Sequence, residues 1–195
     1  MRVDIRSAAG MWVKAVCPAI LYLACRRALR FSGWPPWAEA AGTGVLLAAL
    51  WFYRSRRSRR EPVPWRKAFR TALLYGAAGF AAGGLISLLF GGEQMDARSP
   101  AAVLLLCILG PACEEAVYRG MVFGTAEELG GFRLALVLST VLFACGHRTL
   151  QQMALSVPVG LILGMVRKKE GNLLAPAAFH AALNAAALVF ASRVV

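Results

Sequence analysis

Apolar residues come along the chain in long blocks, and the polar residues fall mostly between these blocks. A helix that crosses a membrane needs roughly 20 predominantly apolar residues, with a usual range of about 17–25. The third, fourth and last blocks reach this length easily, while the second and sixth are short. The pattern predicts an all-α fold, a polytopic membrane helical bundle of about six to seven transmembrane helices, formed by the blocks near residues 11–29, 38–53, 68–90, 100–126, 132–149, 151–166 and 173–192.

The composition also favours a membrane location. Hydrophobic residues make up 58% of the chain and charged residues 16%, whereas about a quarter of the residues of a soluble domain are charged. The five cysteines lie inside apolar stretches without a CxxC spacing, so neither a disulfide nor a zinc cluster is expected from them. The lipid bilayer is therefore the first partner that the sequence predicts.

Positive charge is concentrated in the loops and predicts the orientation of the chain. The net charge is +12, residues 54–70 carry eight Arg or Lys, and a further basic run occupies residues 167–169. Cytoplasmic loops are rich in Lys and Arg, so we expect both segments on the cytoplasmic side and no nucleic acid as a partner. Three further cations do not fit this orientation, namely Arg26, Arg27 and Arg30.

Charged residues interrupt the fourth apolar block, where lipid would be expected. Glu114, Glu115 and Arg119 lie in this block, and the apolar pattern resumes after them. A charge at the centre of a spanning helix costs about 2.5–3.5 kcal/mol, so such residues are rare and usually functional. Glu115 and Arg119 are four residues apart and can pair on one helix face, while Glu114 points about 100° away. The alternative is a charge cluster at a helix end in the membrane interface.

Both histidines of the chain lie in apolar segments that are predicted to be helical. His180 is followed four residues later by Asn184, so these two side chains share a helix face. A lone buried histidine is more often a packed residue than a catalytic one. Two such histidines together with a buried acid favour a catalytic group that contains Glu114, His147, His180 and Asn184.

The spacing of Glu114 and His147 predicts that they lie at the same depth. Their midpoint along the chain is 130.5, at the break Gly130-Gly131. If the chain turns there, each arm of the resulting hairpin is roughly 16 residues long, or ~24 Å at the rise of an α-helix. His180 lies about nine residues past Gly171, or ~14 Å along its own helix. The four polar side chains are expected to meet inside the membrane if the Gly130 turn protrudes ~10 Å farther than the Gly171 turn.

Amide hydrolysis is a reaction that such a set of residues could catalyse. It needs an activated water, a proton donor for the leaving amine, and donors for the developing oxyanion. A buried glutamate suits the role of base, a neighbouring histidine can pass the proton, and the Asn184 amide with the second imidazole can donate to the oxyanion. Two histidines and a glutamate could also bind Zn²⁺, in which case Glu114, His147 and His180 would be the ligands, although the usual HExxH motif is absent.

Three motifs in the second half of the chain resemble those of a known family. They are Glu114-Glu115-x-x-x-Arg119, Phe143-x-x-x-His147 and His180-x-x-x-Asn184, and they look like the motifs of the CPBP intramembrane proteases over about residues 100–190. That group includes CAAX prenyl endopeptidases and bacteriocin-processing or immunity-related proteins.

The resemblance implies a particular role for each motif residue. Glu114 and His147 would activate water, His180 and Asn184 would stabilise the oxyanion, and Arg119 would hold Glu115. The resemblance leaves open whether the mechanism is glutamate-dependent and metal-free or that of a zinc metalloprotease. Under this interpretation residues 1–67 are N-terminal membrane segments with a basic cytoplasmic loop, and residues 68–195 form the catalytic helical core.

The function implied is an endopeptidase that cuts near a membrane-anchored or lipidated terminus of a peptide or protein substrate. CAAX processing, leader-peptide removal and cleavage of a C-terminal sorting tag are the candidate reactions. A catalytically silent scaffold or immunity protein of the same fold is the first alternative, and a proton-coupled transporter is the second. Arginine outnumbers lysine and alanine is abundant, which is typical of GC-rich bacterial genomes, so we expect a multi-pass protein of the bacterial inner membrane.

Overall fold

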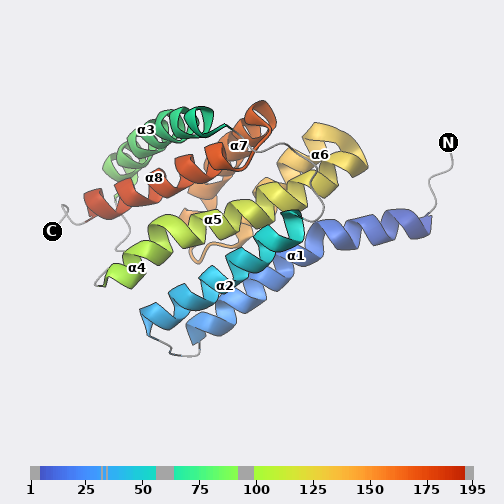
Figure 1. Ribbon diagram of the computed structural model, residues 1–195, viewed down its shortest axis with the longest axis horizontal. Helices are drawn as coiled ribbons and strands as arrows, with labels where there is room; N and C mark the ends of the chain where they lie inside the picture. Colours follow the sequence, from blue (N-terminus) through green and yellow to red (C-terminus); the bar gives the residue numbers. More distant parts are fainter. Residues whose placement is uncertain (1–4, 32, 34, 56–63, 92–98, 192–195) are drawn as a thin grey trace. The chain divides into compact units, whose positions relative to one another are not determined.

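Every regular element of the structure is a helix. The computed structural model describes residues 5–31, 33, 35–55, 64–91 and 99–191, which confirms the predicted all-α class for this part of the chain (Figure 1). The elements in chain order, with η marking π-helical segments, are α1 (Ile5–Phe31), α2 (Pro36–Ser55), α3 (Trp65–Phe90), α4 (Pro100–Leu104), η1 (Leu105–Leu109), α5 (Gly110–Glu115), η2 (Ala116–Val122), α6 (Phe123–Cys145), α7 (Leu150–Glu170) and α8 (Leu174–Ala191).

The chain divides into two compact units, each assembled from two separate stretches. The first unit comprises Met1–Ser32 and Glu114–Gly171, and the second comprises Gly33–Cys113 and Asn172–Val195. The chain passes from the second unit to the first inside α5, between Cys113 and Glu114. The sequence analysis divided the chain at residue 67 into N-terminal membrane segments and a catalytic helical core. That division stays a prediction.

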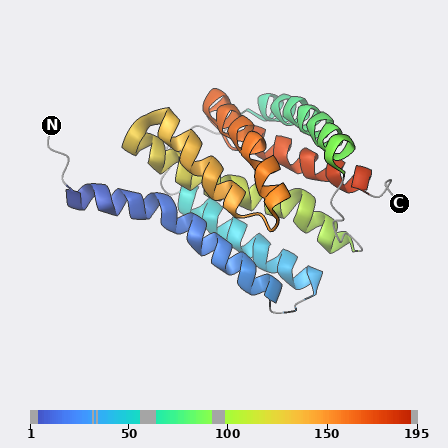
Figure 2. The ribbon, with the colours of Figure 1, turned by 180° about the vertical axis from the view of Figure 1, so that it is seen from behind.

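A hairpin dominates the first unit and confirms the predicted turn at Gly130-Gly131. Gly130 (φ −145°, ψ 19°) and Gly131 (φ 76°, ψ −174°) leave helical geometry inside α6, and the positive φ of Gly131 is one that glycine adopts without steric cost. The chain folds back on itself at this point (Figure 2). Phe123 packs against Phe132 across the turn, with ring centroids 6.2 Å apart.

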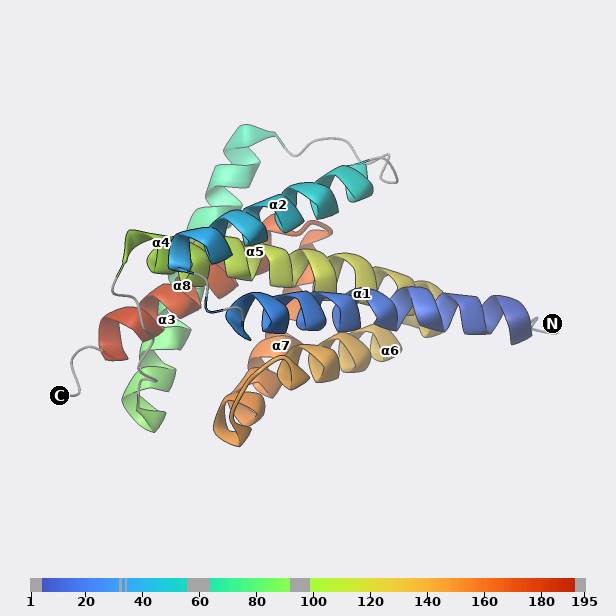
Figure 3. The same cartoon turned by 90° about the horizontal axis from the view of Figure 1, so that it is seen from below.

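Glycines let α7 pack closely against the second arm of α6. A Cβ atom on Gly160 would lie 2.9 Å from Cγ2 of Thr140, and one on Gly164 would lie 2.5 Å from Cδ1 of Leu136. The absence of side chains at these two positions, one turn apart, therefore brings the helices together, as small residues do in membrane helices. Helix α1 runs alongside η2 and α6 in the same unit (Figure 3).

The second unit is built around the packing of α3 on α8. A Cβ atom on Gly79 would overlap the carbonyl group of Phe179, and one on Gly83 would lie 2.5 Å from the carbonyl oxygen of Leu183. The backbones of the two helices thus touch through the glycines of α3. At its start α8 is capped by Asn172, whose Oδ1 accepts hydrogen bonds from the backbone N–H groups of Leu174 (2.9 Å) and Ala175 (3.2 Å).

Three helices of the described residues are long and apolar enough to cross a membrane. They are Trp65–Phe90, Pro100–Cys145 and Leu150–Glu170, of which the second contains the turn at Gly130-Gly131. Many large apolar side chains of α3 are exposed, for example Leu88 and Trp65, as expected for a helix that faces lipid. The predicted total of six to seven crossings stays a prediction, and most of the basic run at residues 54–60 lies outside the described residues.

Candidate functional site

Glu114 forms an ion pair with an arginine that the sequence pattern could not place. The carboxylate is buried, and its Oε1 accepts a hydrogen bond from Nη1 of Arg26, on the second half of α1. The same Nη1 lies 3.3 Å from the hydroxyl oxygen of Tyr22, one turn earlier in α1. Arg26 was one of three cations that did not fit the predicted orientation, and a contact with a buried acid explains its position. The side chain of Arg30 lies outside the described residues.

Glu115 forms the second ion pair, and the predicted spacing with Arg119 is confirmed. Nη1 of Arg119 donates to Oε1 of Glu115 at 3.1 Å, and both side chains are completely buried. Nη2 of Arg119 donates to the carbonyl oxygen of Gly160 at 3.2 Å, and the guanidinium lies 4.3 Å from the ring centroid of Phe143. A buried pair is tolerated only where further hydrogen bonds and contacts compensate for lost hydration, and these contacts supply part of that compensation.

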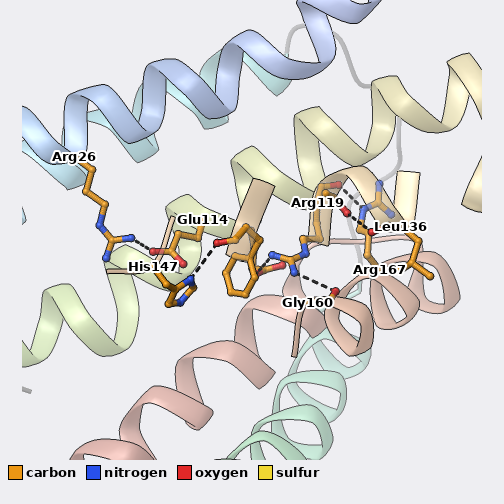
Figure 4. Close-up of polar contacts among 10 residues, drawn as sticks. Arg26, Glu114, Arg119, Leu136, His147, Gly160 and Arg167 are labelled. Atoms are coloured by element: carbon orange, nitrogen blue, oxygen red, sulfur yellow. Dashed lines mark hydrogen bonds and ion pairs between the residues drawn. The ribbon is translucent and has the colours of Figure 1, made fainter. Parts of the chain in front are cut away.

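The backbone of Arg119 is also bound. Its carbonyl oxygen accepts a hydrogen bond from Nε of Arg167, a buried residue in the last turn of α7, at 3.2 Å. Arg119 thus joins η2 to α7 at both its side chain and its backbone (Figure 4). The π-helical segments η1 and η2 directly precede and follow α5, which carries the two glutamates. Such segments occur frequently at functional sites.

His147 lies in a short turn, not in a helix as predicted. Helix α6 ends at Cys145, and α7 begins at Leu150 after its N-cap Thr149. The backbone N–H of His147 donates to the carbonyl oxygen of Ala144 at 3.0 Å. The apolar pattern placed this boundary at residue 150, a few residues late, because only a few polar positions separate the apolar residues of α6 and α7.

The ring of His147 is oriented by Phe143. Nδ1 of the imidazole lies 3.1 Å from the backbone carbonyl oxygen of Phe143, and the two ring centroids are 5.0 Å apart in an edge-to-face arrangement. A carbonyl oxygen can only accept, so Nδ1 carries the proton, and the lone pair of the neutral ring is on Nε2. This is the tautomer that can receive a proton from a water molecule at Nε2.

The side chains of Glu114 and His147 point toward one another (Figure 4), while their joint role in one site stays a prediction. Tyr118 and Phe143 have the same midpoint along the chain as Glu114 and His147, and their rings are in edge-to-face contact with centroids 5.6 Å apart. This contact fixes the register of the two arms one turn away from the acid and the histidine.

His180 and Asn184 lie on α8 in the second unit. His180 is buried, and Nδ2 of Asn184 donates to the backbone carbonyl oxygen of Leu106, in η1, at 3.0 Å. The two residues are one turn apart on the same helix, as their spacing predicted. Their convergence with Glu114 and His147 stays a prediction.

The zinc alternative takes its ligands Glu114, His147 and His180 from both units, and it stays a prediction. Glu114 forms an ion pair with the guanidinium of Arg26. A metal ion bound to the same carboxylate would place a second positive charge next to this guanidinium. No group of three or more His, Cys, Asp or Glu side chains with the geometry of a metal site occurs in the described parts of the chain, whereas a zinc ion takes three or four protein ligands. Arg26 is the partner of Glu114 that the sequence analysis did not identify, because periodicity reveals a misplaced charge but not the residue that it contacts.

The fold and this site define an α-helical integral membrane protein with a carboxylate and an imidazole facing one another. Residues 96–186 match the family described as Type II CAAX prenyl endopeptidase Rce1-like. The match contains all three motifs and confirms the resemblance to the CPBP proteases over this segment.

A comparison with curated proteins agrees with this assignment. The chain is 26% identical over 85 residues to YdiL of Bacillus subtilis (strain 168), a protein provisionally named a membrane peptidase. The alignment covers 44% of this chain and 35% of YdiL, so the chain spans about a third of the relative's length. No solved structure matches the chain.

Proposed function

We propose that the protein is an intramembrane endopeptidase that hydrolyses a peptide bond with a water molecule activated by Glu114 and His147. The observation that carries this proposal is the facing pair of a buried carboxylate and an imidazole whose Nδ1 is fixed on the Phe143 carbonyl. The family match over residues 96–186 supports it independently. A packed structural histidine would explain the Nδ1 contact but not the carboxylate in front of the ring.

The proposed reaction begins with the transfer of a proton from water to Glu114. The water oxygen forms a bond to the carbonyl carbon of the scissile amide, and a tetrahedral intermediate with a negatively charged oxygen results. The C–N bond then breaks, and the leaving nitrogen receives the proton, which Glu114 and His147 pass on. General acid–base catalysis of this kind contributes about 10²–10⁴ in rate.

Asn184 and His180 are proposed to stabilise the negatively charged oxygen. An Asn side chain carries two N–H donors, so Asn184 can donate to an oxyanion while it also donates to Leu106. Removal of one oxyanion donor typically reduces kcat by about 10²–10³. This part of the proposal requires that the two units bring their residues together during catalysis.

The proposed substrate is a peptide or protein held in the membrane near the cleaved bond. A site within an apolar helical protein excludes soluble chains, and a membrane anchor or lipid group delivers the substrate to it. A prenylated C-terminal peptide, a leader peptide and a C-terminal sorting tag are the three substrates to compare.

The test uses the purified full-length chain in lipid vesicles with one reporter of each substrate class. Wild-type protein should cleave one class, and mass spectrometry of both products should show a single hydrolysed bond. Glu114→Ala and His147→Ala should abolish the product at unchanged protein level in the vesicles. Full processing by both variants would contradict the proposal and favour the catalytically silent scaffold.

Dependence on a metal ion is tested separately. Chelator-treated protein should retain its activity, and elemental analysis of the active sample should find less than one equivalent of zinc. Loss of activity on chelation with recovery on addition of Zn²⁺ would contradict the metal-free mechanism while leaving the endopeptidase function in place.

A further inference from the structure

Helix α1 contributes a side chain to the candidate site from outside the segment that matches the family. The matched segment begins at residue 96, and α1 ends at Phe31. Arg26 nevertheless reaches the Glu114 carboxylate. The site of the first unit is therefore built from two stretches that are far apart in the sequence.

Aromatic packing holds this part of α1 in place. Tyr22 is buried, its ring lies 5.9 Å from the guanidinium carbon of Arg26, and its hydroxyl is 3.3 Å from Nη1. The ring of Tyr22 also packs edge-to-face on Tyr118, with centroids 6.1 Å apart, and Tyr118 packs on Phe143. A continuous row of rings thus connects the residue that orients Arg26 with the residue that orients His147.

The ion pair of Arg26 is partly accessible, in contrast to that of Arg119. The Arg26 side chain is 27% exposed and the Glu114 side chain 9%. A carboxylate that only needed charge compensation could be buried completely, as Glu115 is. The Arg26 pair is therefore less enclosed than the Arg119 pair.

We propose that Arg26 is a positioning residue for Glu114, a role that rests on the proposed endopeptidase function. Its guanidinium balances the negative charge of the carboxylate and holds the side chain in the orientation that faces His147. Arg26 does not touch the reacting atoms in this account. Its loss therefore lowers the rate of the chemical step and leaves substrate binding unchanged.

The experiment measures kcat and KM of the full-length protein in vesicles for wild type, Arg26→Ala and Arg26→Lys. Arg26→Ala should lower kcat by about tenfold to a hundredfold, since a displacement of ~1 Å of a reacting group costs about a hundredfold. KM should stay within about twofold. Arg26→Lys should recover part of kcat, because a lysine keeps the charge but not the planar fork of the guanidinium.

Chemical rescue distinguishes positioning from a purely structural role. Millimolar guanidinium chloride should raise kcat of Arg26→Ala several-fold, because the partly exposed site admits the small cation, and should leave wild type unchanged. Equal concentrations of sodium chloride are the control for ionic strength. Arg27→Ala is the matched control, since Arg27 is the adjacent, exposed residue of the same helix and its loss should leave kcat unchanged.

Three results would overturn the inference. The first is an unchanged kcat in Arg26→Ala, and the second is a raised KM at constant kcat, which would make Arg26 a substrate-binding residue. The third is a reduced kcat that guanidinium does not restore and Arg26→Lys does not improve, which would make the role structural. A wild-type protein that cleaves none of the reporters would instead refute the proposed function itself, and with it the role of Arg26.

Discussion

Two adjacent glutamates, each paired with an arginine, occupy very different surroundings in the first unit. Glu115 and Arg119 are completely buried, and Arg119 is further bound by a backbone carbonyl and an aromatic ring. Glu114 is paired with the partly exposed Arg26 of a distant helix. The comparison teaches that neighbouring carboxylates can lie in different surroundings, and we propose that the enclosed pair holds the fold while the pair with the partly exposed arginine serves the chemistry.

The largest expected effect on stability comes from breaking the enclosed pair. Arg119→Met leaves the Glu115 charge buried without its partner, and removal of one partner of such a pair costs about 3–5 kcal/mol. Thermal unfolding of the protein in detergent should therefore show a large fall in Tm, and the amount in the membrane should fall as well. The double variant Glu115→Gln/Arg119→Met removes both charges and should recover much of the loss. If the single variant is as stable as wild type, the pair does not hold the fold.

A smaller loss is expected where the enclosed pair meets α7. Gly160→Ala places a Cβ atom 2.9 Å from Cγ2 of Thr140, close to the carbonyl that binds Arg119, and overpacking of this kind costs about 1–3 kcal/mol. Gly124→Ala is the matched control, because nothing lies within 4 Å of its Cβ position. The unfolding midpoint of Gly160→Ala should be lower than that of Gly124→Ala. Equal midpoints would show that α6 and α7 adapt without strain.

Replacement of Glu114 should change activity and disturb the fold less than the loss of Arg119. Glu114→Gln keeps the shape and removes the charge, and its partner Arg26 is partly exposed, so we expect a smaller fall in unfolding free energy than for Arg119→Met. Cleavage of the reporter should fall by about 10²–10⁴, the contribution of a general base. If Glu114→Gln is inactive and has also lost several kcal/mol of unfolding free energy, the proposed difference between the two ion pairs is contradicted.

The smallest effect is expected at the ring that lies between the two pairs. Tyr118 packs on Tyr22, the neighbour of Arg26, and on Phe143, the neighbour of Arg119. Its buried hydroxyl has no hydrogen-bond partner among the described residues. Tyr118→Phe should therefore change Tm little or raise it slightly, since removal of an unsatisfied buried group is not destabilising. A clear loss of activity with an unchanged Tm would instead give this hydroxyl a part in the reaction.

The sequence predicted the features of this region that depend on local spacing. The pairing of Glu115 with Arg119 follows from the helical repeat, and the turn at Gly130-Gly131 follows from a glycine pair inside an apolar stretch. It could not predict the partner of Glu114, because Arg26 is far away in the sequence and no pattern connects the two. It also placed His147 in a helix, because hydropathy does not resolve a turn of four residues between two apolar helices.

The most direct test of the central claim compares Glu114→Gln with Glu115→Gln in activity per folded molecule. Both variants are reconstituted in the same vesicles, the folded fraction is measured by thermal unfolding, and cleavage of the reporter is divided by that fraction. Glu114→Gln should be folded and inactive, while the folded fraction of Glu115→Gln should be small and retain most of its specific activity. The reverse pattern, an active Glu114→Gln or a folded but inactive Glu115→Gln, would contradict the assignment of chemistry to Glu114.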